Sequence, residues 1–350
     1  MKDFDSISID VKRTTAAWGA ETVEARPGSG APQGYSADIV ADTINPDSGE
    51  RLTTMVVRFP RCILPEVNTH RVFTRNSASS RARSVRTTIG GVMNDPYVPI
   101  FTRNGKGMSG GFLNGPELDK AEAIWLKARD AAVSSELSIL LGDLYHGTPQ
   151  TVGEDWEQYI DLYYDRVYHA DHDTGAPSVH KQNANRIIEP YMWHEALITS
   201  SYWDNFYRLR IDDAAQPEMH LTAMVMKAAM DASHPLASPV HSPFIAVDDP
   251  DDPNAVANAF MMSAAECARI SYKDRTSIGL KESTALAESM LAAGHMSPFE
   301  HQAISSAAAK MLDGIIPAHE PRRGMDADSD EGRLNGNLSP SWVQFRHMVS

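Results

Sequence analysis

The chain has 350 residues and a formal charge of -14 at pH 7, with 42% hydrophobic and 22% charged residues, which is the composition of an ordinary globular protein. The acidic balance argues against a protein that coats nucleic acid, because binding along a phosphate backbone usually needs a net basic face. Cys62 and Cys267 give neither a disulfide framework nor a metal-ligand spacing, and no secretory signal or apolar run of about 20 residues is present. We therefore expect a cytoplasmic protein with no nucleic-acid and no membrane partner.

The first predicted elements are a leader, a hairpin and a long helix. Residues 1–34 end in ARPGSGAPQG, which has little to bury, and they predict a mobile leader. Next, YSADIVADTI and RLTTMVVRFP flank the turn cluster NPDSGE, so we expect a β-hairpin over residues 36–60. Residues 115–144 place apolar side chains on a 3.6-residue period, which predicts a long amphipathic helix within a helical insertion at 91–175.

Two shorter helices are predicted in the second half of the chain. One runs through SSYWDNFYRLR, residues 200–210, where Ser201 and Asp204 have the spacing of a capping box. The other starts near Asp213 and continues through AAQPEMHLTAMVMKAAM, because Pro217 is acceptable only in a first helical turn.

A last helix and a strand are expected towards the end of the chain. The helix has Ser283 as its cap and Gly294 as its stop, which places His295 on a loop. Residues 321–338 are expected to form an exposed loop, and residues 341–349 a closing strand. These elements predict an α/β (α+β) fold, a twisted β-sheet with packed helices, in a single domain after the leader.

A run of arginines stands out in this acidic chain. The stretch THRVFTRNSASSRAR, residues 69–83, lies in a longer segment from Asn68 to Gly90 that contains no Asp or Glu. Its arginines are Arg71, Arg75, Arg81, Arg83 and Arg86. Arginines among Ser and Thr donors can hold a phosphate by charge-assisted hydrogen bonds, although such a run is also typical of a solvated loop. The residues alone leave both interpretations open.

Two histidine-containing segments were considered as metal sites. AGHMSPFEH carries His295, Glu300 and His301, but this spacing differs from H-E-x-x-H and from its inverted form. YHADHDTGAPSVH, residues 168–180, has scattered His and Asp in a Gly-Pro loop, which is more typical of a surface segment. No metal site is therefore predicted.

Together, these segments resemble the flavin-dependent thymidylate synthases. The family signature R-H-R-x-x-S-x-N-E-x-S-x-R aligns with residues 69–81, where the first Arg is replaced by Thr69 and the Glu by Ser77, and Thr74 is a conservative change. The matching positions of this signature are His70, Arg71, Asn76, Ser79 and Arg81.

Four further segments extend the resemblance. The family's N-x-x-x-L-R-x-x-x-x-A-Q-x-E-I is similar to residues 205–219, and its A-R-x-S-[FY] to residues 268–272. Its G-H-x-[ST]-P-F-E-H matches residues 294–301, and NRIIEP resembles its A-R-x-x-L-P, which places Arg186. In common members the G-H-x-S-P-F-E-H block precedes the arginine signature, whereas here it follows. This permuted order resembles that of viral and phage relatives, and circular permutation is tolerated when termini lie close together.

The resemblance implies an activity. A family member would transfer a one-carbon unit from methylenetetrahydrofolate to C5 of dUMP and reduce it with FAD and NADPH to give dTMP, in a homotetramer with flavin sites at subunit interfaces. Two alternatives stay open: C5 hydroxymethylation or methylation of dUMP or dCMP for viral DNA modification, and a non-catalytic nucleotide-binding homologue. The location would be cytoplasmic, in the host cytoplasm if the protein is viral.

The resemblance also implies roles for individual residues. Arg210 would face the pyrimidine carbonyl and stabilise negative charge on the ring, as the catalytic group. Glu66 falls where the family usually has Gln. The residues implied in substrate binding are Glu66, Ser77, Ala78, Ser79, Ser80, Arg81, Arg186 and Arg210. The residues implied in FAD binding are Thr69, His70, Arg71, Val72, Asn76, Asn205, His295 and Ser297.

Overall fold

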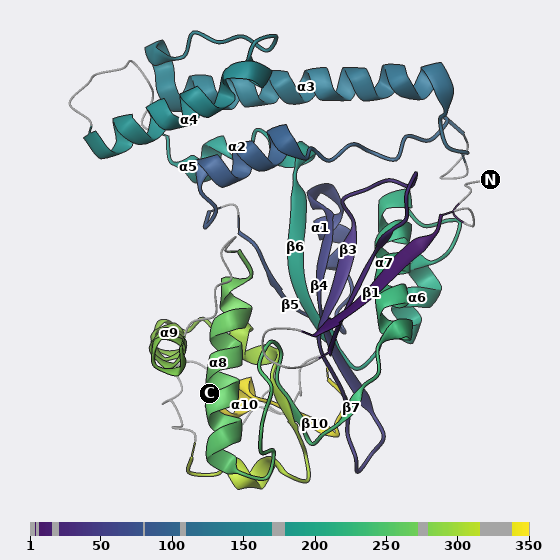
Figure 1. Cartoon of the computed structure of the whole chain (residues 1–350), viewed down its shortest axis with the longest axis vertical. Helices are drawn as coiled ribbons and strands as arrows, with labels where there is room; N and C mark the ends of the chain where they lie inside the picture. Colours follow the sequence, from purple (N-terminus) through teal and green to yellow (C-terminus); the bar gives the residue numbers. More distant parts are fainter. Residues whose placement is uncertain are drawn as a thin grey trace.

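The structure is a computed structural model and describes residues 4, 7–15, 21–79, 81–105, 110–169, 179–271, 279–315 and 338–349. Its elements form three levels: an upper layer of helices, a central sheet flanked by helices, and a lower group of helices with a small sheet (Figure 1). The fold is mixed α and β with a mainly antiparallel sheet and packed helices, which agrees with the predicted α+β class.

The central sheet contains seven strands of the described chain, in the order β1-β2-β3-β4-β6-β5, with β7 beside β3. Their bounds are Ile9–Thr15 (β1), Glu21–Pro27 (β2), Ser36–Ile44 (β3), Arg51–Pro60 (β4), Thr74–Ser77 (β5), Trp193–Ser200 (β6) and Leu236–Ala237 (β7). Neighbours are antiparallel except β7, which runs parallel to β3. The short strand β5 therefore lies at one edge, paired only with β6 in the sheet order.

The predicted hairpin is confirmed as β3 and β4, whose register pairs Ile44 with Arg51. Oδ1 of Asn45 accepts hydrogen bonds from the backbone amides of Asp47 and Ser48 at 2.9 and 3.3 Å. These bonds form an Asx turn, which is the turn chemistry that the NPDSGE segment favours.

The expected mobile leader over residues 1–34 is wrong where the structure has strands β1 and β2. Strands β1 and β2 lie in this segment and pair with each other, and β2 also pairs with β3. Val23 and Ala25 are buried in the main core, whereas Thr22, Glu24 and Arg26, which alternate with them on β2, are not. This alternation of buried and exposed positions is the pattern of a half-buried strand, and the Gly- and Pro-rich composition of the following loop obscured it.

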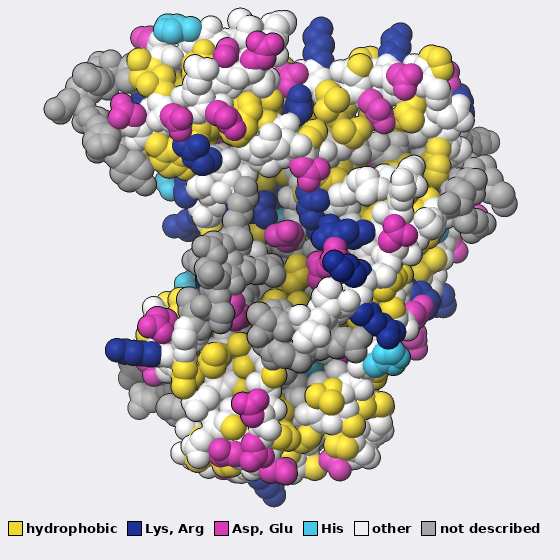
Figure 2. Space-filling view, in the orientation of Figure 1, with side chains coloured by type: hydrophobic (Ala, Val, Ile, Leu, Met, Phe, Trp, Pro, Cys, Tyr) yellow, Lys and Arg dark blue, Asp and Glu magenta, His cyan; other side chains and the backbone are white. Residues whose placement is uncertain are grey.

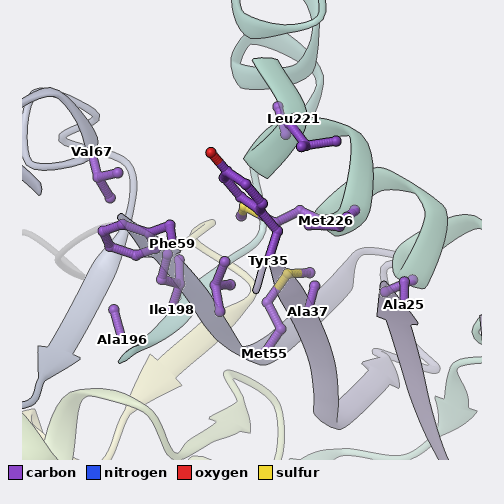
Figure 3. Close-up of a cluster of buried hydrophobic side chains, with 14 of the residues drawn as sticks. Ala25, Tyr35, Ala37, Met55, Phe59, Val67, Ala196, Ile198, Leu221 and Met226 are labelled. Carbon is purple, nitrogen blue, oxygen red and sulfur yellow. The ribbon is translucent and has the colours of Figure 1, made fainter. Parts of the chain in front are cut away.

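The central sheet is covered on both faces. Helices α6 (Asp204–Arg210) and α7 (Pro217–Ala232) cover one face, where Met55 and Ile198 of the sheet pack with Leu221 and Met226 of α7 (Figure 3). The end of helix α8 (Pro253–Ala268) and the 3₁₀ turn that follows it pack against part of the other face. There, Val56, Val40, Leu197, Phe244, Cys267 and Ile270 form a smaller cluster. Neighbouring residues of one strand thus point to opposite faces, as a pleated sheet requires.

The upper layer consists of helices α2 (Val85–Asn94), α3 (Gly115–Leu141), α4 (Val152–His169) and α5 (Lys181–Ala184). They share a separate apolar cluster that includes Ile89, Leu137 and Ile160. The predicted long helix is confirmed as α3, although it ends at Leu141 and residues Gly142–Leu144 form a 3₁₀ turn. Gly142 has φ 58°, a left-handed conformation that favours glycine, so the helix stops there.

The lower group contains α8, α9 (Leu280–Ala293) and a three-stranded sheet in the order β10-β9-β8. Its strands are Val240–His241 (β8), Ala303–Ser305 (β9) and Trp342–Gln344 (β10). Gly294 has φ 74° and ends α9, as predicted. The predicted closing strand is only partly confirmed, because β10 is followed by a helical turn, α10 (Arg346–Val349).

Three predicted helix starts are wrong. Helix α6 starts at Asp204 without a side-chain cap, and Oγ of Ser201 instead accepts from the amide of Ser339 at 2.8 Å. Helix α7 starts at Pro217 rather than near residue 213, since proline fits the first helical position. Helix α9 starts at Leu280, so Ser283 is a buried residue inside it.

The expected exposed loop lies mostly outside the described residues. Residues 321–337 and most of the YHADHDTGAPSVH segment are not described, while Leu338 is buried rather than exposed. Across the described ranges, we find no helix with the length and apolar character needed to span a membrane.

Candidate functional site

Arg210, His70 and Glu66 form a connected group, called the Arg210 cluster below. Glu66 belongs to the short helix α1 (Leu64–Val67), His70 lies in the turn that follows, and Arg210 is the last residue of α6. Nε of Arg210 donates to Nε2 of His70 at 2.9 Å, and Nη1 of Arg210 lies 2.5 Å from Oε1 of Glu66. The ring of Phe206, one turn before Arg210, meets the His70 ring edge-on with centroids 4.9 Å apart, which fixes α6 against this turn.

The imidazole of His70 is neutral in this cluster. Burial, followed by the positive charges of Arg210 and Arg75, lowers the pKa of His70 from its usual value to about 4. A guanidinium has no acceptor, so Nε2 of His70 must be the unprotonated nitrogen that accepts from Arg210. His70 therefore holds Arg210 without adding a positive charge.

Most of the predicted flavin-binding residues on the 69–72 turn lie at the surface beside the Arg210 cluster. Thr69, Arg71 and Val72 are exposed, and Oγ1 of Thr69 donates to the backbone oxygen of Glu66 at 2.7 Å. Asn205 is exposed at the start of α6, and its Oδ1 accepts from Arg208 at 2.8 Å. The structure thus brings the 69–72 turn, Asn205 and Arg210 to one part of the molecule.

The edge strand β5 sends neighbouring side chains to opposite faces of the sheet. Nη1 of Arg75 donates to the backbone oxygens of Val67 and His70 at 3.1 and 3.2 Å, on the side of the Arg210 cluster. Nδ2 of Asn76 donates to the backbone oxygen of Cys267 at 2.8 Å, on the side of α8. Asn76 is therefore separated from the 69–72 turn by the sheet.

The predicted nucleotide-binding residues occupy the turn between β5 and α2. The amide of the buried Ala78 donates to the backbone oxygen of Glu195 at 3.2 Å, and Oγ of Ser79 accepts from the amide of Arg81 at 3.2 Å. Ser77 is half-buried at the end of β5, and Ser80 lies outside the described residues. Arg81 is exposed and makes no ion pair with any described residue, so its guanidinium is available to an anion.

Arg186 lies near the same turn. Nδ2 of its neighbour Asn185 donates to Oγ1 of Thr88, in the first turns of α2, at 3.4 Å. Arg186 itself is exposed. Ser79, Arg81 and Arg186 are thus placed around the start of α2, which is an arrangement that can bind a phosphate.

His295 and Ser297 form a separate exposed group, at the end of α9 and the start of the 3₁₀ helix η5 (Ser297–Glu300). The side chain of Gln344 ties η5 to β5 by donating to the oxygen of Glu300 at 3.0 Å and to Oγ1 of Thr74 at 3.3 Å. We find no hydrogen bond in the described chain between this group and the 69–72 turn. One chain therefore presents the predicted flavin-binding residues in more than one place.

A second group of ionisable residues, which was not predicted from the sequence, lies where β4 ends and β6 begins. Arg58 of β4, Arg83 and Glu195 of β6 line one pocket, and the buried His194 accepts a hydrogen bond from Arg61 at 3.1 Å. Burial, Arg61 and Arg83 lower the pKa of His194 to about 3. The sequence feature that could have indicated this group is the pair His194 and Glu195 in WHEALITS, an otherwise largely apolar strand.

Comparison with protein-family models, with curated proteins and with solved structures gave no match. Within the described residues, no group of three or more His, Cys, Asp or Glu side chains is placed to hold a metal ion. The fold and the site thus define a mixed α and β protein. It has exposed arginines around the start of α2, and its Arg210 is held by Glu66 and His70.

Proposed function

We propose that the protein is a flavin-dependent nucleotide one-carbon transferase that methylates C5 of dUMP with methylenetetrahydrofolate and NADPH. The observation that carries this proposal is the hydrogen bond between Arg210 and His70. These residues belong to two separate motif segments, 140 positions apart, and their side-chain nitrogens are 2.9 Å apart. A resemblance that arose by chance in two segments would not be expected to join their key residues.

The residues present are compatible with FAD. The turn of residues 69–72 offers Arg71, whose exposed guanidinium makes no ion pair within the described chain and suits a pyrophosphate. Thr69, His70, Arg71, Val72, Asn205, His295 and Ser297 would hold the cofactor, which supplies hydride when bound. All but His70 of these are exposed, as expected if the flavin lies between copies of the chain in the proposed homotetramer.

Arg210 would stabilise the negative charge that develops on the pyrimidine ring. Its guanidinium is fixed from two sides, by Glu66 and by neutral His70, and it is partly exposed at the surface. A preorganised cation of this kind lowers the barrier because it needs no reorientation during the reaction. The phosphate of the nucleotide would bind Arg81, Arg186 and Ser79 around the start of α2.

The ion pair between Glu66 and Arg210 favours a second candidate, dCMP as the substrate. An ionised carboxylate only accepts hydrogen bonds. Cytosine presents an amino donor at C4, whereas uracil presents a carbonyl oxygen there, which a carboxylate would repel. A pyrimidine bound against Arg210 and Glu66 would therefore be better matched as cytosine, with methylation or hydroxymethylation at C5 as the outcome.

The visible absorption spectrum of the purified protein tests the flavin proposal, and product masses test the substrate. We expect a yellow protein, and a product from dUMP that is heavier by one methyl group when methylenetetrahydrofolate and NADPH are supplied. A methylated or hydroxymethylated product from dCMP alone would favour the second candidate. A colourless protein that does not bind added FAD would overturn both, and retained nucleotide binding would then indicate a non-catalytic homologue.

A further inference from the structure

A pocket of about 310 Å³ lies between α2 and the ends of β4 and β6. We call it the Arg83 pocket. The residues that line it include Arg58, Arg83, Thr87, Gly91, Asn94, Asp95, Trp193 and Glu195. Lys or Arg and Asp or Glu side chains gather at this level, between the upper helices and the central sheet (Figure 2).

The Arg83 pocket lies on the other face of the sheet from the Arg210 cluster. Arg58 and Glu195 are paired across β4 and β6. Each is two residues from a side chain, Val56 or Leu197, that packs with Cys267 of α8. Because residues two apart on a strand share a face, Arg58 and Glu195 point to the α8 side. None of the motif residues that resemble the flavin-dependent family lines this pocket.

Arg83 lacks the hydrogen bonds that a largely buried guanidinium needs. Only 17% of its side chain is exposed, and its nearest carboxylate oxygen, Oε2 of Glu195, is 3.8 Å away. No hydrogen bond joins its side chain to any part of the chain that the structure describes. The Arg83 nitrogens are not among the fully buried polar atoms that lack a partner, so its unused donors remain accessible from the pocket.

The two neighbouring arginines each pair with a carboxylate, although Nε of Arg61 is buried without a hydrogen-bond partner in the described chain. Arg58 donates to the backbone oxygen of Gly34 at 2.9 Å, pairs with Asp95 and lies over the Trp193 ring at 4.7 Å. Arg61 donates to Glu189 at 2.9 Å. Burial lowers the pKa of Arg83, and although Glu195 opposes this, the positive charges of Arg61 and Arg58 add to it. The potential around Arg83 therefore favours an added anion.

We propose that the Arg83 pocket binds the phosphate or carboxylate group of a small ligand, with the Arg83 guanidinium as the main partner. A guanidinium can make two parallel hydrogen bonds to either group, which would replace the 3.8 Å contact with Glu195. The side chain of Glu195 is 38% exposed and so has room to turn towards solvent when an anion enters. The amide of Asn94 and the hydroxyl of Thr87 supply further donors at the wall.

Gly91 is a position at which a larger side chain can be introduced to obstruct the pocket. Gly91 is an exposed residue that lines the pocket, and a Cβ atom added there would meet no atom within 4 Å, so a larger side chain fits without a clash and would obstruct the pocket opening. Gly91 is inside α2, where replacing glycine also favours the helix. Gly153 of α4 is a matched control, because it is helical, its added Cβ would likewise meet nothing within 4 Å, and it does not line the pocket.

The test is binding of inorganic phosphate and of glutarate to the full chain, measured by calorimetry. The two probes separate a phosphate ligand from a dicarboxylate one. We expect at least one probe to bind, and Arg83→Gln and Gly91→Leu each to weaken it by about 10- to 100-fold, the effect of losing charged hydrogen bonds. Gly153→Leu and Arg86→Gln should bind as the unmodified protein does.

Three outcomes would overturn the proposal. They are failure of both probes to bind, unchanged binding by Arg83→Gln and Gly91→Leu, and an equal loss in Gly153→Leu. If Arg83→Gln fails to fold, as judged by circular dichroism, Gly91→Leu decides. The measurement needs neither flavin nor turnover, so it stands apart from the test of the proposed enzyme.

Discussion

Thr199 and His301 are joined by a buried hydrogen bond of 2.8 Å between Oγ1 and Nδ1, although they are 102 positions apart. Thr199 also bonds Thr54 at 2.6 Å, Thr54 bonds Nε2 of His241 at 2.7 Å, and Nδ1 of His241 bonds Thr43 at 2.7 Å. This buried chain connects the central sheet to the lower group of elements. It contains two histidines that must stay neutral, since no carboxylate takes part in it.

These histidines should make the fold sensitive to acid. Burial lowers the pKa of His301 to about 3, and burial with His301 lowers that of His241 to about 3. The unfolded chain binds these protons near pH 6.5, so stability is fully present above pH 6.5 and is lost as pH falls towards 3. We expect about 1.4 kcal/mol of loss per pH unit for each histidine. Denaturant unfolding between pH 8 and 5 measures this.

A non-titrating variant provides the control for this pH dependence. His301→Gln should reduce the slope of stability against pH below 6.5, whereas His146→Gln, at an exposed position, should leave it unchanged. Equal slopes in all three proteins would contradict the assignment of the acid sensitivity to the buried chain.

Glu136 of α3 should have the opposite effect. It is fully buried, neither carboxylate oxygen has a hydrogen-bond partner in the described chain, and burial raises its pKa to about 8. The folded protein therefore keeps a proton that the unfolded chain releases above about pH 4.5, so stability falls as pH rises from 4.5 to 8. Glu136→Leu should stabilise the protein at pH 8 by on the order of 2–4 kcal/mol.

Thermal or denaturant unfolding at pH 5 and pH 8 checks the effect of Glu136. The gain should be larger at pH 8 than at pH 5. The exposed Glu157→Leu is the control on the neighbouring helix α4. A gain of the same size at both pH values would mean that packing, and not the carboxyl group, is responsible.

Loss of Arg210 should remove turnover and spare flavin binding. A preorganised group that stabilises developing charge typically contributes about 100- to 1,000-fold to turnover. Arg210→Ala should therefore bind FAD nearly normally and lose activity on this scale. Arg208→Ala should be mild by comparison, because Arg208 is exposed and its side chain bonds Asn205, away from Arg210 and His70. Steady-state kinetics with FAD titration compares them, and the reverse ranking would show that the motif is misaligned.

Glu66 should influence which pyrimidine is accepted. Glu66→Gln keeps the shape of the side chain but adds an amide donor, which suits the carbonyl of uracil better than the amino group of cytosine. We expect the ratio of kcat/KM for dUMP over that for dCMP to rise by about tenfold. Glu189→Gln is a matched control, since Glu189 also pairs with an arginine and has similar exposure, 29% against 26%. An unchanged ratio would mean that Glu66 does not face the base.

Neither cysteine should be the nucleophile. Burial raises the pKa of the Cys62 thiol, which reduces its thiolate fraction. Cys267 is buried on the α8 face, where its sulfur contacts Gln302 and its backbone oxygen binds Asn76. Cys62→Ala and Cys267→Ala should each retain most turnover. Loss of activity in a variant that still binds flavin would refute this.

The sequence allowed prediction of features that depend on local chemistry or on side chains within one segment. The NPDSGE turn and the long helix α3 are of this kind, although Ile124 of the expected apolar face is 60% exposed and the buried residues of α3 lie at its C-terminal end. The cap at Ser201 was wrong because its hydroxyl is used by Ser339, far along the chain. The single-domain prediction stays a prediction: the buried clusters are separate, and Trp125 packs against both the sheet core and the upper helices.

The candidate site was predictable only in part. The motif segments identified Arg210 and His70 as site residues. They did not predict that Glu66 would form an ion pair with the Arg210 guanidinium. The Arg83 pocket was invisible, because it depends on the meeting of β4, β6 and α2, which lie in three separate parts of the sequence. Which arginines of the 69–83 run are satisfied by the protein itself is decided by such long-range contacts.

The four residues of β5 contribute side chains to two different regions, the Arg210 cluster on one face of the sheet and the contacts with α8 on the other. Arg75 forms hydrogen bonds on the side of the Arg210 cluster, and Asn76 forms one on the α8 side. The contacts of both regions therefore depend on the face of the sheet to which each β5 side chain points. One inserted or deleted residue in Thr74–Ser77 would reverse every side chain of the strand. The hydrogen bonds of β5 on both faces of the sheet would then be lost together, although the other residues were unchanged. Evolution can therefore vary the side chains of this strand far more easily than its length.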